Sequence, residues 1–243
     1  MRAGSWEWGD DYIECRYPGS VEAARRQVPG LVKLLGLDKR ARILDCPCGW
    51  GRYSNPLAEL GYDVVGFDFT EKFIEMARLE APPKDPPRYE VRDMRKLDIS
   101  EEYDALLNLF GSFGYYSRRT DLSILKAFTR ALKPGGRLMI DQYNKEKMGR
   151  LPKRIRQKLP GGKVLVREQS MDLARGTYHL IETIHSGTHR KKNRLEMNWY
   201  SVTEYRRMLR ELGIEKVELY GDYDGTPYSV DSERQIVLAT KSA

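Results

Sequence analysis

The residues best suited to chemistry gather in one short segment in the first quarter of the chain. Residues 44–54 read LDCPCGWGRYS and combine an aspartate, two cysteines and two glycines. Cys46 and Cys48 could form part of a metal site, act as a redox pair or fill a tight turn. A zinc site needs three or four ligands at suitable spacing, whereas Cys15 and the histidines lie far away in the sequence. We therefore expect two small packed side chains and no metal.

The glycines of this segment indicate a close approach of the backbone to a ligand. Gly49 and Gly51 are spaced G-x-G, and Ser54 stands where a dinucleotide-binding fingerprint has its third glycine. Glycine permits positive φ angles and leaves the backbone uncovered. Taken alone, the pattern also fits any tight turn between a strand and a helix.

Three aspartates sharpen this interpretation, because each follows a segment that reads as a strand. They are Asp45, Asp68 and Asp93, the last with Met94 beside it. Carboxylates at neighbouring strand ends suit a nucleoside attached to a cationic group better than a pyrophosphate. Asp68 could accept hydrogen bonds from ribose hydroxyls, and Met94 could lie beside an adenine amine. The alternative is that each acid is a helix cap or an ordinary exposed acid.

The elements that position these residues alternate between strands and helices from residue 40 to residue 144. This alternation predicts an α/β fold, a Rossmann-like doubly wound sheet of seven mostly parallel strands. Ligands of such sheets bind beyond the carboxyl ends of the strands. Expected strands are 41–46, 63–69, 88–94, 103–110, 137–143, 215–225 and 233–241; expected helices are 55–60, 70–81, 121–132 and 201–212, with a turn at 133–136.

The remaining segments complete a single domain over residues 1–243. Residues 1–39 should form an N-terminal helical lid, interrupted at Pro29, in front of a cofactor-binding core at 40–144. Residues 145–200 should form an inserted cap with a small antiparallel β-meander of three runs, 163–173, 177–187 and 194–200. Residues 201–243 should supply the closing helix, which begins with a capping box from Ser201 to Glu204, and two strands.

Composition and charge narrow the class of protein. With 40% hydrophobic and 32% charged residues, the chain reads as a folded soluble domain. It lacks an apolar run long enough for a membrane span and an apolar leader, so we expect a cytoplasmic protein without membrane contact. Much of the net charge of +7 lies in 145–163 and 189–194. This excess fits a solvated surface, an anionic small substrate or nucleic acid, and charge alone does not separate the three.

Several segments together resemble class I S-adenosylmethionine-dependent methyltransferases. They are ILDCPCGWGRYSNPLAELGYDVVGFDFTEKFIEMAR, VRDMRKL, YDALLNLFGSFGYY, LKPGGRLMIDQYN and LYGDYDGTPYSVDSERQIVLATK. The likeness is strongest to small-molecule-type members with a DxPCGxGR loop and a C-terminal GDxDG segment. It covers nearly the whole chain and is weakest over 145–200. In the C-terminal segment, Arg234 would either close the pocket or brace the last strands.

The resemblance implies S-adenosyl-L-methionine as cofactor and S-adenosyl-L-homocysteine as product. Gly49 and Gly51 would face the methionine carboxylate, Asp45 its ammonium group and Asp68 the ribose, while Trp50 departs from the family pattern and would pack on the surface. The two tyrosines Tyr12 and Tyr17 would be lid contacts, and Phe69 would pack on the adenine. Asp93 and Met94 would lie at the adenine edge, and Asn108 and Leu109 beneath the sulfonium. The full set of cofactor-binding residues carried over by position is Tyr12, Tyr17, Asp45, Gly49, Gly51, Asp68, Phe69, Asp93, Met94, Asn108 and Leu109.

The chemistry would be an in-line displacement by an N or O nucleophile on the activated methyl group. An aromatic segment after the fourth strand supplies a substrate pocket from Phe110, Phe113, Tyr115 and Tyr116, unless these rings line the edge of the core. Candidate catalytic residues are His185 and Glu182, on opposite faces of one meander strand, and Tyr143 at the end of the fifth strand. Each of these could instead be structural or exposed.

The nature of the acceptor stays open at this point. The inserted meander can enclose a small ligand, and no RNA-binding module is appended, so a small-molecule acceptor is favoured. The basic excess stands against this choice, unless the small acceptor is anionic. A methyltransferase acting on RNA or protein is the first alternative. Proteins of other classes that fit the glycine loop are an NAD-type oxidoreductase and a cofactor-binding protein without catalytic activity.

Overall fold

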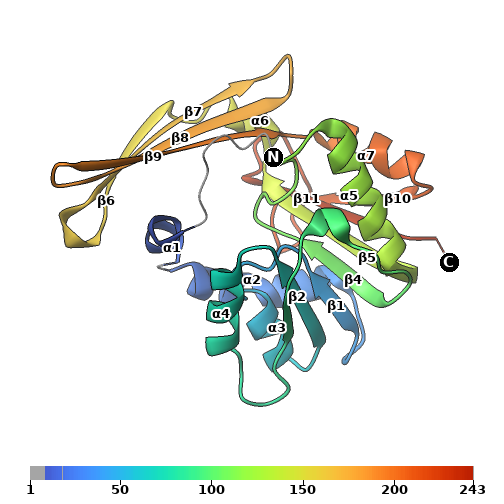
Figure 1. Ribbon diagram of the computed structural model, residues 1–243. Coiled ribbons are helices and arrows are strands. Elements are labelled where there is room, and N and C mark those ends of the chain that lie inside the picture. The colour runs from blue at the N-terminus through green and yellow to red at the C-terminus, as the bar shows by residue number, and fades with distance from the viewer. Residues whose placement is uncertain (1–8, 18, 243) are drawn as a thin grey trace.

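The computed structural model describes residues 9–17 and 19–242 and contains two sheets (Figure 1). The larger sheet has seven strands in the order β10-β11-β5-β4-β1-β2-β3, and only β11 runs antiparallel to its neighbours. Its strands are β1 (Arg42–Asp45), β2 (Asp63–Asp68), β3 (Arg88–Val91), β4 (Tyr103–Asn108), β5 (Leu132–Tyr143), β10 (Lys216–Tyr220) and β11 (Arg234–Thr240). The predicted Rossmann-like α/β fold is confirmed.

Helices cover both faces of this sheet because successive residues of each central strand point to opposite sides. Leu44 and Leu106 pack with α5 and α7, whereas Ile43 and Ala105 pack with α2 and α3. The helices are α1 (Asp10–Arg16), α2 (Ser20–Leu35), α3 (Ser54–Glu59), α4 (Glu71–Leu79), α5 (Arg118–Ala131), α6 (Lys145–Met148) and α7 (Val202–Glu211), with 3₁₀ turns η1 (Met94–Lys96) and η2 (Pro160–Gly162).

Two helix boundaries differ from the sequence-based expectation. Helix α2 continues through Pro29, since the buried residues Ala24, Val28, Leu31 and Leu35 hold one continuous face of it against the core. Proline removes a single intrahelical N–H, and the packing of this face outweighs that loss. Helix α5 begins at Arg118, three residues earlier than expected. Its cap is Ser117, whose hydroxyl accepts a hydrogen bond from the backbone N–H of Thr120.

The expected turn at 133–136 lies within strand β5. The pairing of β4 with β5 shifts register between Tyr103 and Ala105, and Gly135 takes a positive φ of 76°. A glycine at this point lets the chain form an irregular strand without a steric penalty. The proline and glycines at 134–136, which predicted a turn, therefore form an irregular part of strand β5.

The inserted region forms a four-stranded antiparallel sheet, one strand more than expected. It contains β6 (Arg154–Lys158), β7 (Val164–Asp172), β8 (Thr177–Ser186) and β9 (His189–Asn198), in that spatial order. Strand β6 has the sequence RIRQK and lies at the sheet edge. Edge strands tolerate charged residues on the solvent side, so a basic segment that lacks an apolar pattern still forms a strand.

None of the helices in 9–17 and 19–242 combines the length and apolar character needed to cross a bilayer. The longest of the helices described, α2, has 16 residues and carries charged side chains along its exposed side.

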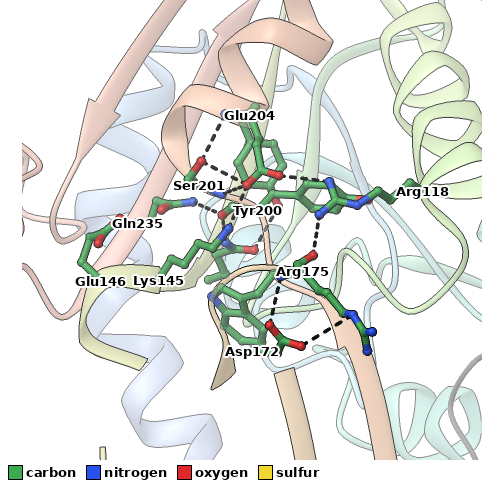
Figure 2. Close-up of polar contacts among 12 residues, drawn as sticks. Arg118, Lys145, Glu146, Asp172, Arg175, Tyr200, Ser201, Glu204 and Gln235 are labelled. Carbon is green, nitrogen blue, oxygen red and sulfur yellow. Dashed lines mark hydrogen bonds and ion pairs between the residues drawn. The ribbon is translucent and has the colours of Figure 1, made fainter. Parts of the chain in front are cut away.

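A polar network joins the two sheets near the start of α7 (Figure 2). The Glu204 carboxylate accepts hydrogen bonds from Arg118 at 3.0 Å and from Lys145 at 2.9 Å. It also completes the predicted capping box with Ser201. Arg118 in turn donates to the backbone carbonyl of Arg175, in the turn between β7 and β8, at 2.9 Å. This network therefore fixes the meander to the core.

We expect Glu204→Gln to destabilise the fold. Burial opposes ionisation, but hydrogen bonds from the Ser201 N–H, Lys145 and Arg118 outweigh it and lower the pKa of Glu204 to about 2. A lowered carboxyl pKa stabilises the folded state above the unfolded pKa of about 4.5, and this contribution is lost as the pH falls towards 2. Urea denaturation at pH 7 should show a loss of about 2 kcal/mol in the free energy of unfolding.

The difference between the variant and the wild-type protein should shrink as the pH is lowered from 5 to 3. Glu211→Gln on the same helix is the matched control, because that exposed carboxylate forms no ion pair with any of the residues described. Equal effects of both substitutions, or a difference that does not depend on pH, would contradict the assignment.

Candidate active site

The loop between β1 and α3 is a tight glycine turn. Gly49 and Gly51 have positive φ angles of 54° and 74°. A Cβ on Gly51 would lie 2.4 Å from the Tyr89 hydroxyl, whereas nothing lies within 4 Å of a Cβ on Gly49. The turn therefore needs glycine at 51 for packing, and the backbone at 49 stays open for a ligand.

The two cysteines of this loop are buried in its interior. The Cys48 N–H donates to the carbonyl of Phe67 at 2.8 Å, and the Cys46 N–H to that of Leu107 at 2.9 Å. Burial raises the pKa of both thiols well above the usual range, so they remain protonated. Within 9–17 and 19–242, no three His, Cys, Asp or Glu side chains come together as metal ligands would.

A pocket of about 880 Å³ opens at the carboxyl ends of β1, β2 and β4. This is the edge of the sheet at which ligands of doubly wound folds bind. Nine of the side chains or backbones predicted for cofactor or substrate line it, namely Tyr12, Asp45, Gly49, Asp68, Phe69, Met94, Leu109, Phe110 and Tyr115.

The other predicted cofactor residues lie just outside this pocket. The Asn108 side chain donates to the Cys46 carbonyl at 2.8 Å and so fixes the loop from below. The Asp93 carboxylate caps η1 and forms an ion pair with Arg95. Gly51 lies within the turn, and the ring of Tyr17 packs on that of Trp50 with centroids 5.7 Å apart.

Two of the predicted substrate-pocket rings belong to the core. Phe113 packs against Tyr200 and Tyr205 with ring centroids 5.5 and 5.7 Å apart. Tyr116 is buried beside them in the same apolar cluster, and neither ring lines the pocket. Phe113 and Tyr116 therefore belong to the core, which was the alternative expectation, whereas Phe110 and Tyr115 line the pocket.

Two buried carboxyl groups, Asp45 and Asp68, line the pocket together with three arginines. Asp45 is only 2% exposed and accepts a hydrogen bond from Ser54 at 2.6 Å. Burial raises its pKa to about 7, although Ser54 and the nearby Arg52 favour the charged form. Asp68 accepts hydrogen bonds from the N–H groups of Gly49 and Thr70 at 3.0 and 2.8 Å, and burial also raises its pKa.

Trp50 is buried, contrary to the expectation that it packs on the surface. It is 6% exposed and lines the pocket. Its ring contacts Phe73 at 5.3 Å and Tyr12 at 6.1 Å between centroids, so that α1, the glycine loop and α4 form one aromatic wall. The position between two glycines gave no signal for this, because the partners come from distant parts of the chain.

The pocket is also lined by Arg52, which sequence reasoning did not single out. Its guanidinium lies 3.8 Å from the centroid of the Phe110 ring and 5.1 Å from that of Tyr53. Such stacking suits arginine. Arg52 forms no ion pair with any residue in 9–17 or 19–242, although it lines the pocket. Its charge is therefore available to a ligand.

A buried ion pair holds Phe110 in place beneath Arg52. Phe110 has a positive φ of 59°, and its N–H donates to Asp141 at 3.0 Å. The same carboxylate accepts a hydrogen bond from the Arg234 Nε at 2.6 Å. Arg234 therefore braces the last strands and the pocket loop, and it does not itself line the pocket.

The three candidate catalytic residues do not line the pocket. Glu182 is 4% exposed, and its carboxylate is bound by Arg16 at 2.7 Å and Arg167 at 2.8 Å. His185 is exposed on the opposite face of the meander sheet. Tyr143 is 43% exposed and contacts Phe110 from outside, with ring centroids 6.1 Å apart.

The polar atoms of the pocket fit a nucleoside that carries a positive charge. The Trp50 Nε1 is buried without a hydrogen-bond partner among residues 9–17 and 19–242, and Trp50 lines the pocket. Buried polar groups in proteins are nearly always paired. A ligand with hydroxyl groups and a cationic end would satisfy such groups and neutralise Asp45 and Asp68.

Comparisons with known proteins agree with this site. Residues 43–136 match the family model described as "Methyltransferase domain". The chain is 30% identical over 219 residues to a glycine/sarcosine N-methyltransferase of Halorhodospira halochloris, an alignment that covers 82% of this chain and 75% of that protein. It is 27% identical over 223 residues to the putative methyltransferase YqeM of Bacillus subtilis (strain 168), with 85% of this chain and 86% of that protein covered.

The fold is shared with solved structures as well. The CcbJ methyltransferase from Streptomyces caelestis superposes with a TM-score of 0.77 at 20% identity, over 93% of this chain and 90% of that chain. The glycine loop, the strand-end carboxylates and the relatives, which match over at least 75% of their own length, support one family assignment. The chain belongs to the class I S-adenosylmethionine-dependent methyltransferases.

Proposed function

We propose that the protein transfers the methyl group of S-adenosylmethionine to an N or O nucleophile of a small-molecule acceptor that carries an anionic group. The observation that supports the anionic group is the Arg52 guanidinium, which lies in the pocket wall on the Phe110 ring without an ion-pair partner among the residues described. A relative of known name, the glycine/sarcosine N-methyltransferase of Halorhodospira halochloris, methylates small amines that carry a carboxylate, as its name says.

Several residues would hold the cofactor, which supplies a methyl group activated by a positively charged sulfur. Asp45 would bind the ammonium group, and the open backbone at Gly49 would face the carboxylate. Asp68, fixed by two backbone N–H groups, would accept the ribose hydroxyls. Met94 and Phe69 line the part of the pocket that would receive the adenine.

The pocket residues around Arg52 would orient the acceptor and exclude water. Arg52 would bind the anionic group, while Tyr12 and Tyr115 line the remaining surface. Holding two reactants in the productive orientation can supply roughly 7–11 kcal/mol of a barrier. Aromatic faces near a developing cation add about 0.5–2 kcal/mol each. Alignment is therefore the main contribution that we assign to this pocket.

The proposal does not require a general base inside the pocket. Glu182 is neutralised by Arg16 and Arg167, and we assign it the role of holding Arg16 at the pocket wall. An amine that enters without its extra proton can attack directly and lose a proton to water afterwards. Tyr143, which contacts the wall at Phe110, is the remaining candidate for an acceptor that must lose a proton first.

Substitution of Asp68 tests the ribose role. Asp68→Asn keeps the size of the side chain and one accepting oxygen but removes the charge, so we expect S-adenosylhomocysteine to bind more than tenfold more weakly in calorimetry. Methylthioadenosine, which has the same nucleoside without the amino acid, should lose affinity to a similar extent. Unchanged affinity for both ligands, with the fold verified by circular dichroism, would refute the role.

The pH dependence of binding tests Asp45. With a pKa of about 7 in the free protein, Asp45 is mostly charged at pH 8 and mostly protonated at pH 6. Only the charged form attracts an ammonium group, so S-adenosylhomocysteine should bind about tenfold more weakly at pH 6 than at pH 8. Methylthioadenosine lacks the ammonium group and serves as the control.

Asp45→Asn should remove this pH dependence and bind S-adenosylhomocysteine weakly at both pH values. If the variant retained the wild-type pH profile, another group would have to carry the titration, and the role of Asp45 would be wrong.

Substitution of Arg52 tests the nature of the acceptor. With glycine and sarcosine as probes, Arg52→Gln should lower kcat/KM at least thirtyfold while the affinity for S-adenosylhomocysteine changes less than threefold. Arg92→Gln is the matched control, since Arg92 also lines the pocket but forms an ion pair with Glu90. Methylation of glycinamide in preference to glycine by the wild-type protein would contradict the anionic acceptor.

A further inference from the structure

One face of the meander sheet carries a regular array of positive charge. Across the sheet, Arg156 lies in register with Lys192, with Val166 and Thr183 between them. The flanking rows place Arg154 opposite Arg194 and Lys158 opposite Arg190 in the same way. We call this surface the basic face; its cations are Arg154, Arg156, Lys158, Arg190, Lys192 and Arg194, three on β6 and three on β9.

These six cations are exposed, and none forms an ion pair or side-chain hydrogen bond with a residue in the described ranges. The only acid within the three rows is Glu168. A hollow of about 1050 Å³ lies on this face, lined by Arg154, Arg156, Val164, Val166 and His185. Six cations therefore stand with a single acid in these three rows, which leaves a net positive field that would attract an anionic partner.

The basic face lies on the far side of the sheet from the methyl-transfer pocket. Side chains alternate along β8, so that Glu182 faces α1, where it binds Arg16, while Thr183 and His185 face the other way. Figure 1 shows α1 between the meander and the larger sheet. The charge of the basic face therefore cannot serve the small acceptor that Arg52 would bind.

The spacing of the charges excludes a single small anion as ligand. Cations on β6 and β9 are three strand spacings apart, about 14 Å, and alternate residues along one strand are about 7 Å apart. An extended chain of anions can contact both lines of charge, whereas one phosphate or carboxylate cannot. Val166, the apolar residue of the central row, is buried, so little apolar surface is available to insert into a membrane or receive an amphipathic helix.

We propose that the basic face docks the phosphate backbone of a nucleic acid. Each phosphate would meet an arginine or lysine, and the three rows contain no phenylalanine, tyrosine or tryptophan to stack on bases, so contacts to phosphate would dominate and the binding would be independent of sequence. The nucleic acid is a partner held on the surface, and this inference does not depend on the identity of the methyl acceptor.

Fluorescence anisotropy with a labelled 20-base-pair RNA duplex, the same length of DNA duplex and single-stranded RNA tests the proposal. We expect binding at 50 mM salt. The logarithm of the binding constant should fall linearly with the logarithm of the salt concentration, with a slope of about −3 to −5, since each phosphate contact contributes about −0.9. The triple substitution Arg156→Glu, Lys192→Glu and Arg194→Glu should weaken binding at least thirtyfold, with S-adenosylhomocysteine affinity unchanged.

The matched control reverses three exposed cations on the helices, Lys126→Glu, Arg206→Glu and Arg207→Glu, and so changes the net charge equally. It should weaken binding less than threefold. Equal losses in both triple variants would overturn the assignment to the basic face. If the glutamate triple variant fails to fold, Arg156→Gln, Lys192→Gln and Arg194→Gln should still weaken binding about tenfold.

Three further results would overturn the proposal. They are the absence of nucleic-acid binding at 50 mM salt, binding to vesicles of phosphatidylserine and phosphatidylcholine that exceeds binding to every nucleic acid, and a dimer in light scattering that the basic-face substitutions dissociate. The last result would show that a second copy of this chain covers the face.

Discussion

The buried ion pair between Asp141 and Arg234 is the interaction on which the rest of the site depends. Asp141 lies on β5 and is fully buried, and Arg234 begins the antiparallel strand β11 beside it. The Asp141 side chain and backbone also accept the N–H groups of Phe110 and Gly111. Removing one partner of such a pair typically costs 3–5 kcal/mol, because a buried charge is left alone. One interaction thus ties β5 and β11 to the loop on which Arg52 rests.

Unbalanced charge gives both sides of the site their character. Asp45 and Asp68 are held at neighbouring strand ends by hydrogen bonds and form no ion pair with a residue in the described ranges, which favours a positively charged ligand, while the nearby Arg52 favours the charged form of Asp45. Arg52 lines the same pocket and forms no ion pair with a carboxylate in 9–17 or 19–242. In the meander, by contrast, the buried Glu182 carboxylate is neutralised by ion pairs with Arg16 and Arg167. The alternation of strand residues places the six cations of the basic face, on β6 and β9, on the outer side of the sheet.

Local sequence patterns predicted most of the fold and the part of the site formed by the glycine loop between β1 and α3. The buried runs of the central strands, the capping box at Ser201 and the turn at Gly49 follow from periodicity and backbone sterics, which depend only on neighbouring residues. Strand β6 was missed because its charges conceal the strand pattern, and pairing with β7 supplies what its own sequence lacks. Continuity of α2 through Pro29 depends likewise on packing against the core.

The sequence by itself determined the class of fold, the glycine turn and the family of the cofactor, since each is written in contiguous residues. Tertiary structure alone decided which side chains share the pocket. It brought Trp50 against Tyr12 and Phe73, set Arg52 on Phe110, and placed Glu182 against Arg16 and away from the pocket. The physical reason is that such contacts join residues far apart in the chain, and their energies depend on burial and distance, which no local spacing encodes.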